Sequence, residues 1–243
     1  MLEAIREQFR DLKNQGSPFN MKIIGIVGSP RKIKGNTGRL MLEVLKAAQK
    51  EGAAFETVDL PGGTVLPCKA CDTCHKKGFC PQKDDFEAIK AKIMESDGVV
   101  LASPNYIFSV SAQMKALMDR CCGVIHRLAF EGKYGASVVT SGGGDEAPIA
   151  DFMNHFMITT GIIPVGSVWA TMGTIAGDEF PRDILENAKA LGRKLVHDWQ
   201  NRIMPPEIEQ RKAQFMERMR QLMTYRKDEW PFEYEYWKKE RKL

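Results

Sequence analysis

The sequence has no long hydrophobic run and no large excess of charge of either sign. None of its apolar segments reaches the roughly 20 residues that a membrane-spanning helix needs. The N-terminal segment MLEAIREQFRDLKNQG is charged throughout and lacks the apolar core of a signal peptide. The 35 Lys and Arg residues are nearly balanced by 31 Asp and Glu residues, which leaves a net charge of +4. These features predict a cytoplasmic protein that binds neither membranes nor nucleic acids.

The chain also lacks the two common nucleotide-binding fingerprints. Its first glycine-rich segment, GSPRKIKGNTG (28–38), has neither the Gly-Lys-Ser/Thr of a Walker loop nor the Gly-x-Gly-x-x-Gly of a dinucleotide loop. It does place Ser, Arg, Asn and Thr side chains between an apolar run and a helix N-terminus. Backbone N–H groups and the helix dipole favour a phosphate there. The segment is therefore predicted to bind a phosphate, and a plain turn with an N-cap is the alternative.

Apolar runs alternate with helical patterns from about residue 21 to residue 203. Five strand–helix units in series predict an α/β fold with a doubly wound, five-stranded parallel sheet. Ligands of such sheets bind beyond the carboxyl ends of the strands, where the unusual loops of this chain lie. Strands are expected at 21–29, 54–60, 98–104, 134–144 and 161–170, and helices at 37–52, 84–97, 111–125, 146–160 and 181–203.

Two extensions flank this body. Residues 1–20 are expected to form an N-terminal helical extension, and residues 204–243 a C-terminal one that begins at the Pro205–Pro206 pair. The C-terminal helix must pack its apolar stripe on this chain or on another subunit, and the aromatic segment EWPFEYEYW is typical of interfaces. We expect both extensions to clasp a neighbouring subunit in a homodimer or homotetramer, with a strap on the same chain as the alternative. The stripe comprises Ile208, Phe215, Met219 and Leu222.

Four of the six cysteines lie in one short segment, CKACDTCHKKGFC (68–80). Two x-x spacings followed by five residues and a Cys-Pro pair place the thiols close together on a loop over residues 67–81. Ferredoxin-type clusters use a related short-spaced run. The spacing leaves open an iron–sulfur cluster, zinc, a redox dithiol and cysteines without a metal. The candidate ligands are Cys68, Cys71, Cys74 and Cys80.

The remaining sulfur-containing residues and the nearby histidine are expected to have no ligand role. His75 lies within the cysteine segment but should face solvent, because four thiols are already available. Cys121 and Cys122 are adjacent in a predicted helix and point about 100° apart, so they should pack in the core instead of sharing a metal. Met114, Met118, Met153 and Met157 follow helical spacing and are also expected in the core.

Three segments together resemble a known family, the NADPH-dependent FMN reductase group of flavodoxin-like proteins. Residues 28–38 resemble its phosphate loop, SPNYIFSVSAQMKALMDR (103–120) its isoalloxazine loop and TSGGG (140–144) its second flavin-edge loop. The resemblance covers roughly residues 21–200. It implies a flavodoxin-like FMN-binding domain over residues 21–203 and a flavin-dependent oxidoreductase with NAD(P)H as an electron donor. Since FMN carries the hydride chemistry, no side chain is expected to be catalytic.

The resemblance also assigns the FMN contacts. The phosphate would lie against the side chains of the first loop. The second loop would offer backbone groups to the polar edge of the flavin and wall its ring, and the glycines would let the backbone approach the pyrimidine edge. The expected cofactor-binding residues are Ser29, Arg31, Asn36, Thr37, Pro104, Asn105, Tyr106, Ile107, Phe108, Ser141, Gly142, Gly143 and Gly144.

The cysteine segment resembles the iron–sulfur flavoprotein branch of the same group. Members of that branch carry Cys-x-x-Cys-x-x-Cys with a short gap to a fourth cysteine and bind a [4Fe–4S] cluster near the flavin. The resemblance implies a cluster on the four cysteines that exchanges electrons with FMN, with a ferredoxin-like carrier as a partner. Two alternatives stay open: a cluster-free NAD(P)H:flavin or quinone reductase with structural cysteines, and a non-enzymatic FMN- or zinc-binding sensor.

Overall fold

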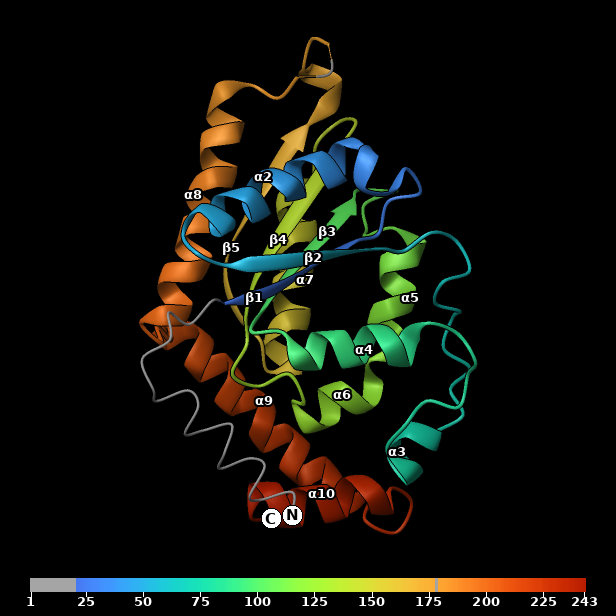
Figure 1. The fold of residues 1–243 in the computed structure, drawn as a ribbon. Helices are drawn as coiled ribbons and strands as arrows, with labels where there is room; N and C mark the ends of the chain where they lie inside the picture. Colours follow the sequence, from blue (N-terminus) through green and yellow to red (C-terminus); the bar gives the residue numbers. More distant parts are fainter. Residues whose placement is uncertain (1–20, 178) are drawn as a thin grey trace.

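A computed structural model describes residues 21–177 and 179–243, so the predicted N-terminal extension lies outside the described residues. Five parallel strands form one sheet in the order β2-β1-β3-β4-β5 (Figure 1). The predicted doubly wound parallel sheet is confirmed, and its order is that of flavodoxins, whose ligand lies where the order reverses between β1 and β3. The strands are β1 (Lys22–Val27), β2 (Ala54–Asp59), β3 (Gly98–Pro104), β4 (Tyr134–Ser141) and β5 (Ile163–Thr171).

Helices cover both faces of the sheet, as the continuously apolar central strands require. Strands β3 and β4 are buried along their whole length, whereas the edge strand β2 is mostly exposed or half-buried. One core forms under α2 (Asn36–Lys50) and α8 (Arg182–Gln200). A second core on the opposite face packs under α4 (Phe86–Glu95), α5 (Ala112–Arg120) and α7 (Glu146–Thr160). The four methionines predicted in the core are buried in this second layer.

Two segments differ from the expected helices. The single helix expected over 111–125 is divided at Cys121 into α5 and α6 (Cys122–Arg127). A short helix, α3 (Thr73–Lys77), lies inside the cysteine segment, between left-handed backbone at Asp72 (φ 56°) and Gly78 (φ 83°). Five residues are too few for a hydrophobic period to show, which is why the pattern did not predict α3. Short 3₁₀ turns, η1 (Lys32–Lys34) and η2 (Met172–Thr174), follow β1 and β5.

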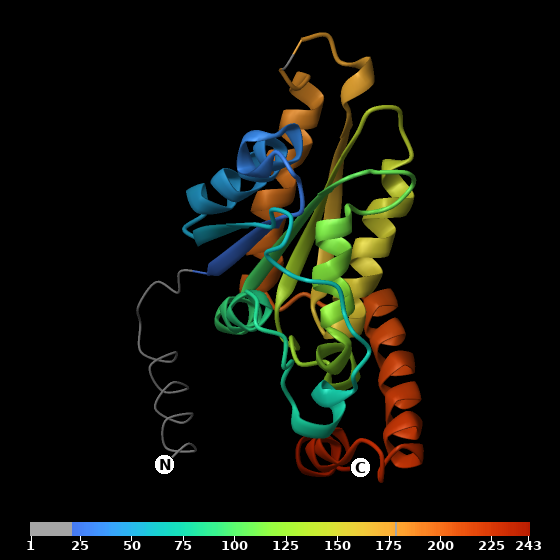
Figure 2. The same cartoon turned by 90° about the vertical axis from the view of Figure 1, so that its right-hand side faces the viewer.

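The C-terminal extension folds onto its own chain. It forms α9 (Pro206–Tyr225) and α10 (Pro231–Arg241), which lie at the end of the molecule opposite the carboxyl ends of the strands (Figures 1 and 2). Trp237 is fully buried, and its Nε1 donates to the carbonyl of His126 at 2.9 Å. The apolar stripe of α9 is thus covered within one chain, and the predicted subunit contact stays a prediction. This third core comprises Leu128, Phe215, Met219, Met223 and Trp237.

In the described part of the chain, no helix combines the length and the apolar character that crossing a membrane requires.

Candidate active site

The loop after β1 is held in place from both sides. The buried Ser29 accepts a hydrogen bond from the backbone N–H of Arg31 at 3.2 Å. The backbone N–H of Ile33 donates to Asp59 Oδ1 at 2.8 Å, which ties the loop to the end of β2. A Cβ at Gly38 would lie 2.5 Å from the Ile33 Cα, so only glycine lets the loop pack this closely on α2. The loop is therefore rigid without a ligand.

The N-terminus of α2 faces this loop and has free donors. The first N–H groups of an α-helix have no intrahelical partner, and among the described residues no side chain caps α2. Its first turn carries Asn36 and the buried Thr37, whose Oγ1 lies 2.5 Å from Thr140 Oγ1 at the end of β4. Arg31 is exposed at the rim of the loop. Uncapped N–H groups, a hydroxyl and a guanidinium together suit an anion such as a phosphate.

The loop after β3 presents exposed apolar side chains on a fixed turn. Residues Ile107 and Phe108 both adopt left-handed backbone (φ 48° and 58°) and are 90% and 75% exposed. The backbone N–H of Tyr106 donates to the carbonyl of Ser109 at 2.9 Å, which closes the turn. An exposed apolar surface on an ordered turn indicates a binding site for a flat, apolar group.

A serine pair positions this turn against β1. Ser111 caps α5, accepting from the N–H of Met114 at 3.2 Å, and its hydroxyl also donates to the carbonyl of Gly28. Its own N–H donates to the buried Ser103 Oγ at 2.9 Å. These contacts fix the turn after β3 relative to the loop after β1. Neither serine was predicted as a site residue, although Ser111 stands at a predicted helix start, where N-caps are common.

The loop after β4 forms an open surface of backbone. Around Gly142, Gly143 and Gly144, no other described atom lies within 4 Å of where a Cβ would stand, and Gly144 has φ +119°. Asn105 joins this loop to the turn after β3, since its Nδ2 donates to the carbonyl of Gly144 at 3.0 Å. Its Oδ1 is buried and has no hydrogen-bond partner among the described residues. That atom is an unused hydrogen-bond acceptor beside the glycine loop.

A buried carboxylate supports the glycine loop from below. Glu146 accepts from the Ser141 hydroxyl and from Thr171 Oγ1, the latter at 2.6 Å, and Ser141 Oγ in turn accepts from the N–H of Gly144 at 2.8 Å. Burial favours the neutral carboxyl, but these hydrogen bonds outweigh it and lower the pKa of Glu146. The glycine loop is therefore supported by a charged carboxylate whose Oε1 accepts two hydrogen bonds.

The three loops fit an FMN molecule. All the predicted cofactor-binding residues lie at or beyond the carboxyl ends of β1, β3 and β4, on neighbouring strands of the sheet. The uncapped α2 terminus suits a phosphate, the exposed turn suits the ring, and the open glycine surface with the free Asn105 Oδ1 suits a polar ring edge. The direct contacts of each residue with FMN stay a prediction.

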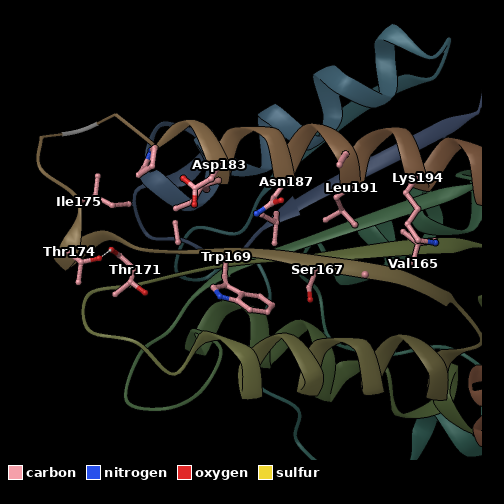
Figure 3. Close-up of a pocket in the computed structure, with 16 residues that line it drawn as sticks. Val165, Ser167, Trp169, Thr171, Thr174, Ile175, Asp183, Asn187, Leu191 and Lys194 are labelled. Atoms are coloured by element: carbon pink, nitrogen blue, oxygen red, sulfur yellow. Dashed lines mark hydrogen bonds between the residues drawn. The ribbon is translucent and has the colours of Figure 1, made fainter.

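A separate cavity lies at the far edge of the sheet. It has a volume of about 670 Å³ and is lined by β5 and α8, with Asp183 and Asn187 of α8 directed towards β5 (Figure 3). None of the residues predicted to bind FMN or metal lines it. The cavity is therefore distinct from the three-loop site.

The four clustered cysteines are reduced and unevenly exposed. None forms a disulfide in the described part of the chain; Cys68 and Cys71 are exposed, whereas Cys74 and Cys80 are half-buried. Cys71 Sγ lies 3.4 Å from the hydroxyl of Thr73, and hydrogen bonding to Thr73 lowers the pKa of the Cys71 thiol. Free thiols with hydrogen-bond donors beside them are a donor set that suits iron or zinc.

Arg120 anchors the cysteine segment to the body. Its guanidinium is buried, donates to both oxygens of Asp84 at 2.6 and 3.1 Å, and reaches the carbonyl of Leu66 at 2.9 Å. Its Nε donates to Cys80 Sγ at 3.2 Å. Burial alone would raise the pKa of Asp84, but the hydrogen bonds from Arg120 and from two backbone N–H groups, together with the charge of Arg120, outweigh it and lower the pKa. Arg120 is the last residue of the segment that resembles the isoalloxazine loop, and its contact with the cysteine segment was not predicted.

The cysteine segment runs away from the flavin loops of its own chain. From the end of β2 it descends to α3, which packs against α10 at the opposite end of the molecule (Figures 1 and 2). Among the described residues, the four cysteines are not part of the group of ligand-type side chains that could hold a metal ion. The donor set fits a cluster, but the chain alone does not draw the thiols together.

A different group of ligand-type side chains is drawn together beside α3. His75, Cys122 and His126 bring one ligand atom each within 4.8 Å of the other two. The expectation that His75 faces solvent is wrong, because it is only 4% exposed and packs against Trp230. Cys121 is a core residue as predicted, but Cys122 turns towards the histidines. The Cys-x-x-x-His spacing, which puts both side chains on one helix face, was the signal in the sequence.

Charges within this group are strongly coupled. Burial would lower the pKa of both histidines. The neighbouring Cys122 and Cys74 thiols and the charge of Glu233 raise the pKa of His75 to about 12, and hydrogen bonds to Cys122 and Glu233 raise the pKa of His126 to about 9. Hydrogen bonds from the two imidazoles lower the pKa of Cys122 to about 6. Cys121, in contrast, has its pKa raised to about 12 by burial. The thiol of Cys122 therefore loses its proton more readily than an ordinary cysteine, whereas the thiol of Cys121 loses it less readily.

Comparison with known proteins identifies the family of this chain. The family model described as NADPH-dependent FMN reductase matches residues 21–176. An iron-sulfur flavoprotein of Archaeoglobus fulgidus is 37% identical over 90% of this chain and 98% of its own length. A second, from Methanocaldococcus jannaschii, is 38% identical over 72% of this chain and 96% of its own. Among solved structures, a flavone reductase shares the fold, with a TM-score of 0.59 and 18% identity over 74% of this chain and 64% of that one. The chain therefore belongs to the NADPH-dependent FMN reductase family of flavin-dependent oxidoreductases, within its iron-sulfur flavoprotein branch.

Proposed function

We propose that this protein transfers electrons between FMN in the three-loop site and a [4Fe–4S] cluster on Cys68, Cys71, Cys74 and Cys80. The observation that supports this most directly is the free four-thiol segment, which the buried Arg120 fastens to a body with a formed flavin site. The relatives named iron-sulfur flavoproteins support the same function. Bound FMN supplies the step between a hydride pair and single electrons, which is what a one-electron partner needs.

The residues of this chain would bind FMN and orient it. The α2 terminus with Thr37 and Arg31 would neutralise the phosphate, and Ser29 keeps their loop in shape. The turn at Ile107 and Phe108 would cover the ring and exclude water from one face. Asn105 and the glycine loop would hold the polar ring edge. No side chain of the site is required as an acid or base, which leaves redox control to burial and hydrogen bonding.

The fourth cysteine has an additional positioning residue. Arg120 donates to Cys80 Sγ, and this hydrogen bond fixes the position of the sulfur atom. Hydrogen bonds to the sulfur ligands also tune the potential of a cluster. Arg120 would therefore hold the cysteine segment in place and favour the reduced state of the cluster.

The electron donor, partners and compartment complete the proposal. NAD(P)H is the donor, a ferredoxin-like carrier the one-electron partner, and the cytoplasm the compartment, where exposed thiols such as Cys68 and Cys71 stay reduced. A homodimer or homotetramer is also proposed. The support is that α3 lies at the opposite end of the molecule from the flavin loops of the same chain (Figures 1 and 2). In an oligomer, the cysteine segment of a second copy could lie close to those flavin loops.

The test is anaerobic reconstitution with FMN, iron and sulfide, followed by absorption spectroscopy, iron analysis and electron paramagnetic resonance. The expected result is one FMN and one [4Fe–4S] cluster per chain, with the cluster bleached on reduction. Cys71→Ser should lose the cluster but keep FMN, whereas the matched core variant Cys121→Ser should keep both. FMN with no bound iron in the wild type would favour the cluster-free reductase. Failure to bind FMN would contradict the proposal altogether.

A further inference from the structure

A second ligand-type cluster lies beside the cysteine segment and uses none of its four cysteines. His75 comes from α3, and Cys122 and His126 come from α6. Glu233, on α10, lies behind both imidazoles, with its Oε2 2.8 Å from His126 Nδ1 and its Oε1 3.0 Å from His75 Nδ1. The cluster therefore joins three helices that are far apart in the sequence.

The buried carboxylate orients the two rings. Because His126 Nδ1 faces Glu233, its Nε2 is left to face Cys122 Sγ at 3.9 Å. The imidazoles of His75 and His126 stack with centroids 4.6 Å apart, and Trp230 lies 4.6 and 5.1 Å from them. A carboxylate on one ring nitrogen commonly fixes the tautomer and raises the basicity of a metal-binding histidine. The arrangement is that of imidazoles prepared to act as ligands.

Several polar atoms here are buried without a hydrogen-bond partner among the residues that the structure describes. They include His75 Nδ1, Glu233 Oε1 and Arg127 Nη1, of which the last lies 4.0 Å from Glu233 Oε1 in an ion pair. His75 is 4% exposed and Glu233 is 0% exposed, so bulk water does not reach them. The 3.0 Å contact between His75 and Glu233 lacks the alignment of a hydrogen bond. Unsatisfied buried groups at one point commonly indicate an ion or water that belongs there.

The distances suit a small cation bound by sulfur and nitrogen. Zinc bonds of about 2.0–2.1 Å to nitrogen and about 2.3 Å to sulfur place two tetrahedral ligands roughly 3.5 Å apart. The 3.9 Å between Cys122 Sγ and His126 Nε2 needs to shorten by only a few tenths of an ångström, and the largest separation in the group is 4.8 Å. A thiolate with imidazoles favours zinc over magnesium or calcium, which prefer oxygen.

We propose that His75, Cys122 and His126 bind one zinc-class divalent cation, with Glu233 as the carboxylate that orients the imidazoles. The cation would fasten α3 to α6 and α10. The three helices already pack closely at this junction. A Cβ at Gly123 would lie 3.2 Å from Cys74 Cβ, and one at Gly78 would lie 2.3 Å from the Phe232 ring. Since His75 follows Cys74 directly, the cation would also restrain the cysteine segment.

The experiment uses the full-length chain with Cys68→Ser and Cys71→Ser. Both thiols are exposed, so the substitutions should leave the fold intact, and the four-cysteine motif can then hold neither a cluster nor a four-thiolate metal. The result is thus independent of the proposed electron transfer. After chelator treatment, anaerobic titration with Co²⁺ should give one bound ion per chain, with a thiolate-to-cobalt charge-transfer band that Zn²⁺ abolishes.

Matched variants in the same background locate the ion. Adding Cys122→Ser should remove the charge-transfer band, whereas adding Cys121→Ser, its neighbour in the core, should leave it unchanged. Glu233→Gln should weaken Zn²⁺ binding by about 10- to 100-fold while keeping the stoichiometry. If circular dichroism shows that Cys122→Ser is unfolded, His126→Gln gives the equivalent measurement, with His155→Gln on α7 as its control.

The absence of Co²⁺ binding in the Cys68→Ser, Cys71→Ser protein would overturn the proposal. So would a charge-transfer band of equal intensity after Cys122→Ser, because the thiolate would then have to come from another residue.

Discussion

The two ends of this molecule are organised in different ways. At the carboxyl ends of the strands, loops are held by backbone and hydroxyl contacts to the sheet, as between Ile33 and Asp59 or Ser111 and Gly28. At the opposite end, α3, α6 and α10 meet through buried charged side chains, with Glu233 between two histidines. The loops of the flavin site are fixed by contacts to the sheet, whereas the cysteine end gathers several unsatisfied buried atoms around Glu233.

This difference indicates which end depends on its ligand. A loop tied to a parallel sheet keeps its shape because the strands already fix both of its ends. A junction of short helices around buried charges is stable only if those charges are compensated, since each uncompensated one costs several kcal/mol. We therefore expect FMN to bind a preformed site and metal to complete the structure of the cysteine end.

The strongest test of this comparison is removal of Arg120, which links the two ends. Arg120→Met should lower the free energy of unfolding by about 3–5 kcal/mol, because Asp84 is left buried and unpaired. Lys115→Met is the matched control on the same helix, where an exposed pair with Asp119 contributes within about 0.5 kcal/mol. Urea unfolding of both variants measures the effect. Equal midpoints would show that Arg120 does not anchor the cysteine segment.

The open glycine surface gives a test of the preformed flavin site. Gly142→Val should leave the free energy of unfolding unchanged, because no other described atom lies within 4 Å of the new Cβ. It should weaken FMN binding about tenfold to hundredfold, since the isopropyl group takes space that the ring edge needs. Fluorescence titration with FMN measures the affinity. Gly62→Val, at an equally open glycine outside the three loops, is the control, and equal FMN affinity in both variants would contradict the site.

The body of the fold was predictable because its strands are buried on both faces. Continuous apolar runs such as those of β3 and β4 cannot be surface segments, and their alternation with amphipathic helices specifies a parallel sheet. The same alternation predicted that the three loops lie together, because carboxyl ends of neighbouring parallel strands share one edge. Sequence alone therefore indicated both the layer order and the position of the flavin site.

The junction around His75 was not predictable in this way. Its three helices are far apart in the sequence, since Glu233 follows His126 by 107 residues, and no hydrophobic period links α3 to α10. His75 looked like a solvated loop residue because five-residue helices leave no pattern. Glu233 lay within an aromatic segment whose helix, α10, gives no clear apolar stripe. The supporting roles of Ser111, Glu146 and Arg120 were not predicted for a similar reason. Each holds a loop through hydrogen-bond partners on other strands and loops.

The smallest expected effect concerns the clamp that holds the C-terminal helices on the body. Glu131 pairs with Lys212 of α9 and Arg241 of α10. Burial of Glu131 favours its neutral form, but these cations outweigh burial and lower its pKa. Its stabilisation is therefore present above the unfolded-state pKa of about 4.3 and is lost as the pH falls through the lower folded-state value.

Glu131→Gln should lower the free energy of unfolding at pH 7 by about 0.5–1 kcal/mol, because the pair is partly exposed and screened. The difference from wild type should shrink as the pH falls below about 4, where the wild-type carboxyl is also protonated. Urea unfolding at both pH values measures it, with the more exposed Glu217→Gln on α9 as the control. A constant difference across that range would mean that the clamp acts through packing alone. The C-terminal helices would then be held by the buried Trp237 core and not by charge.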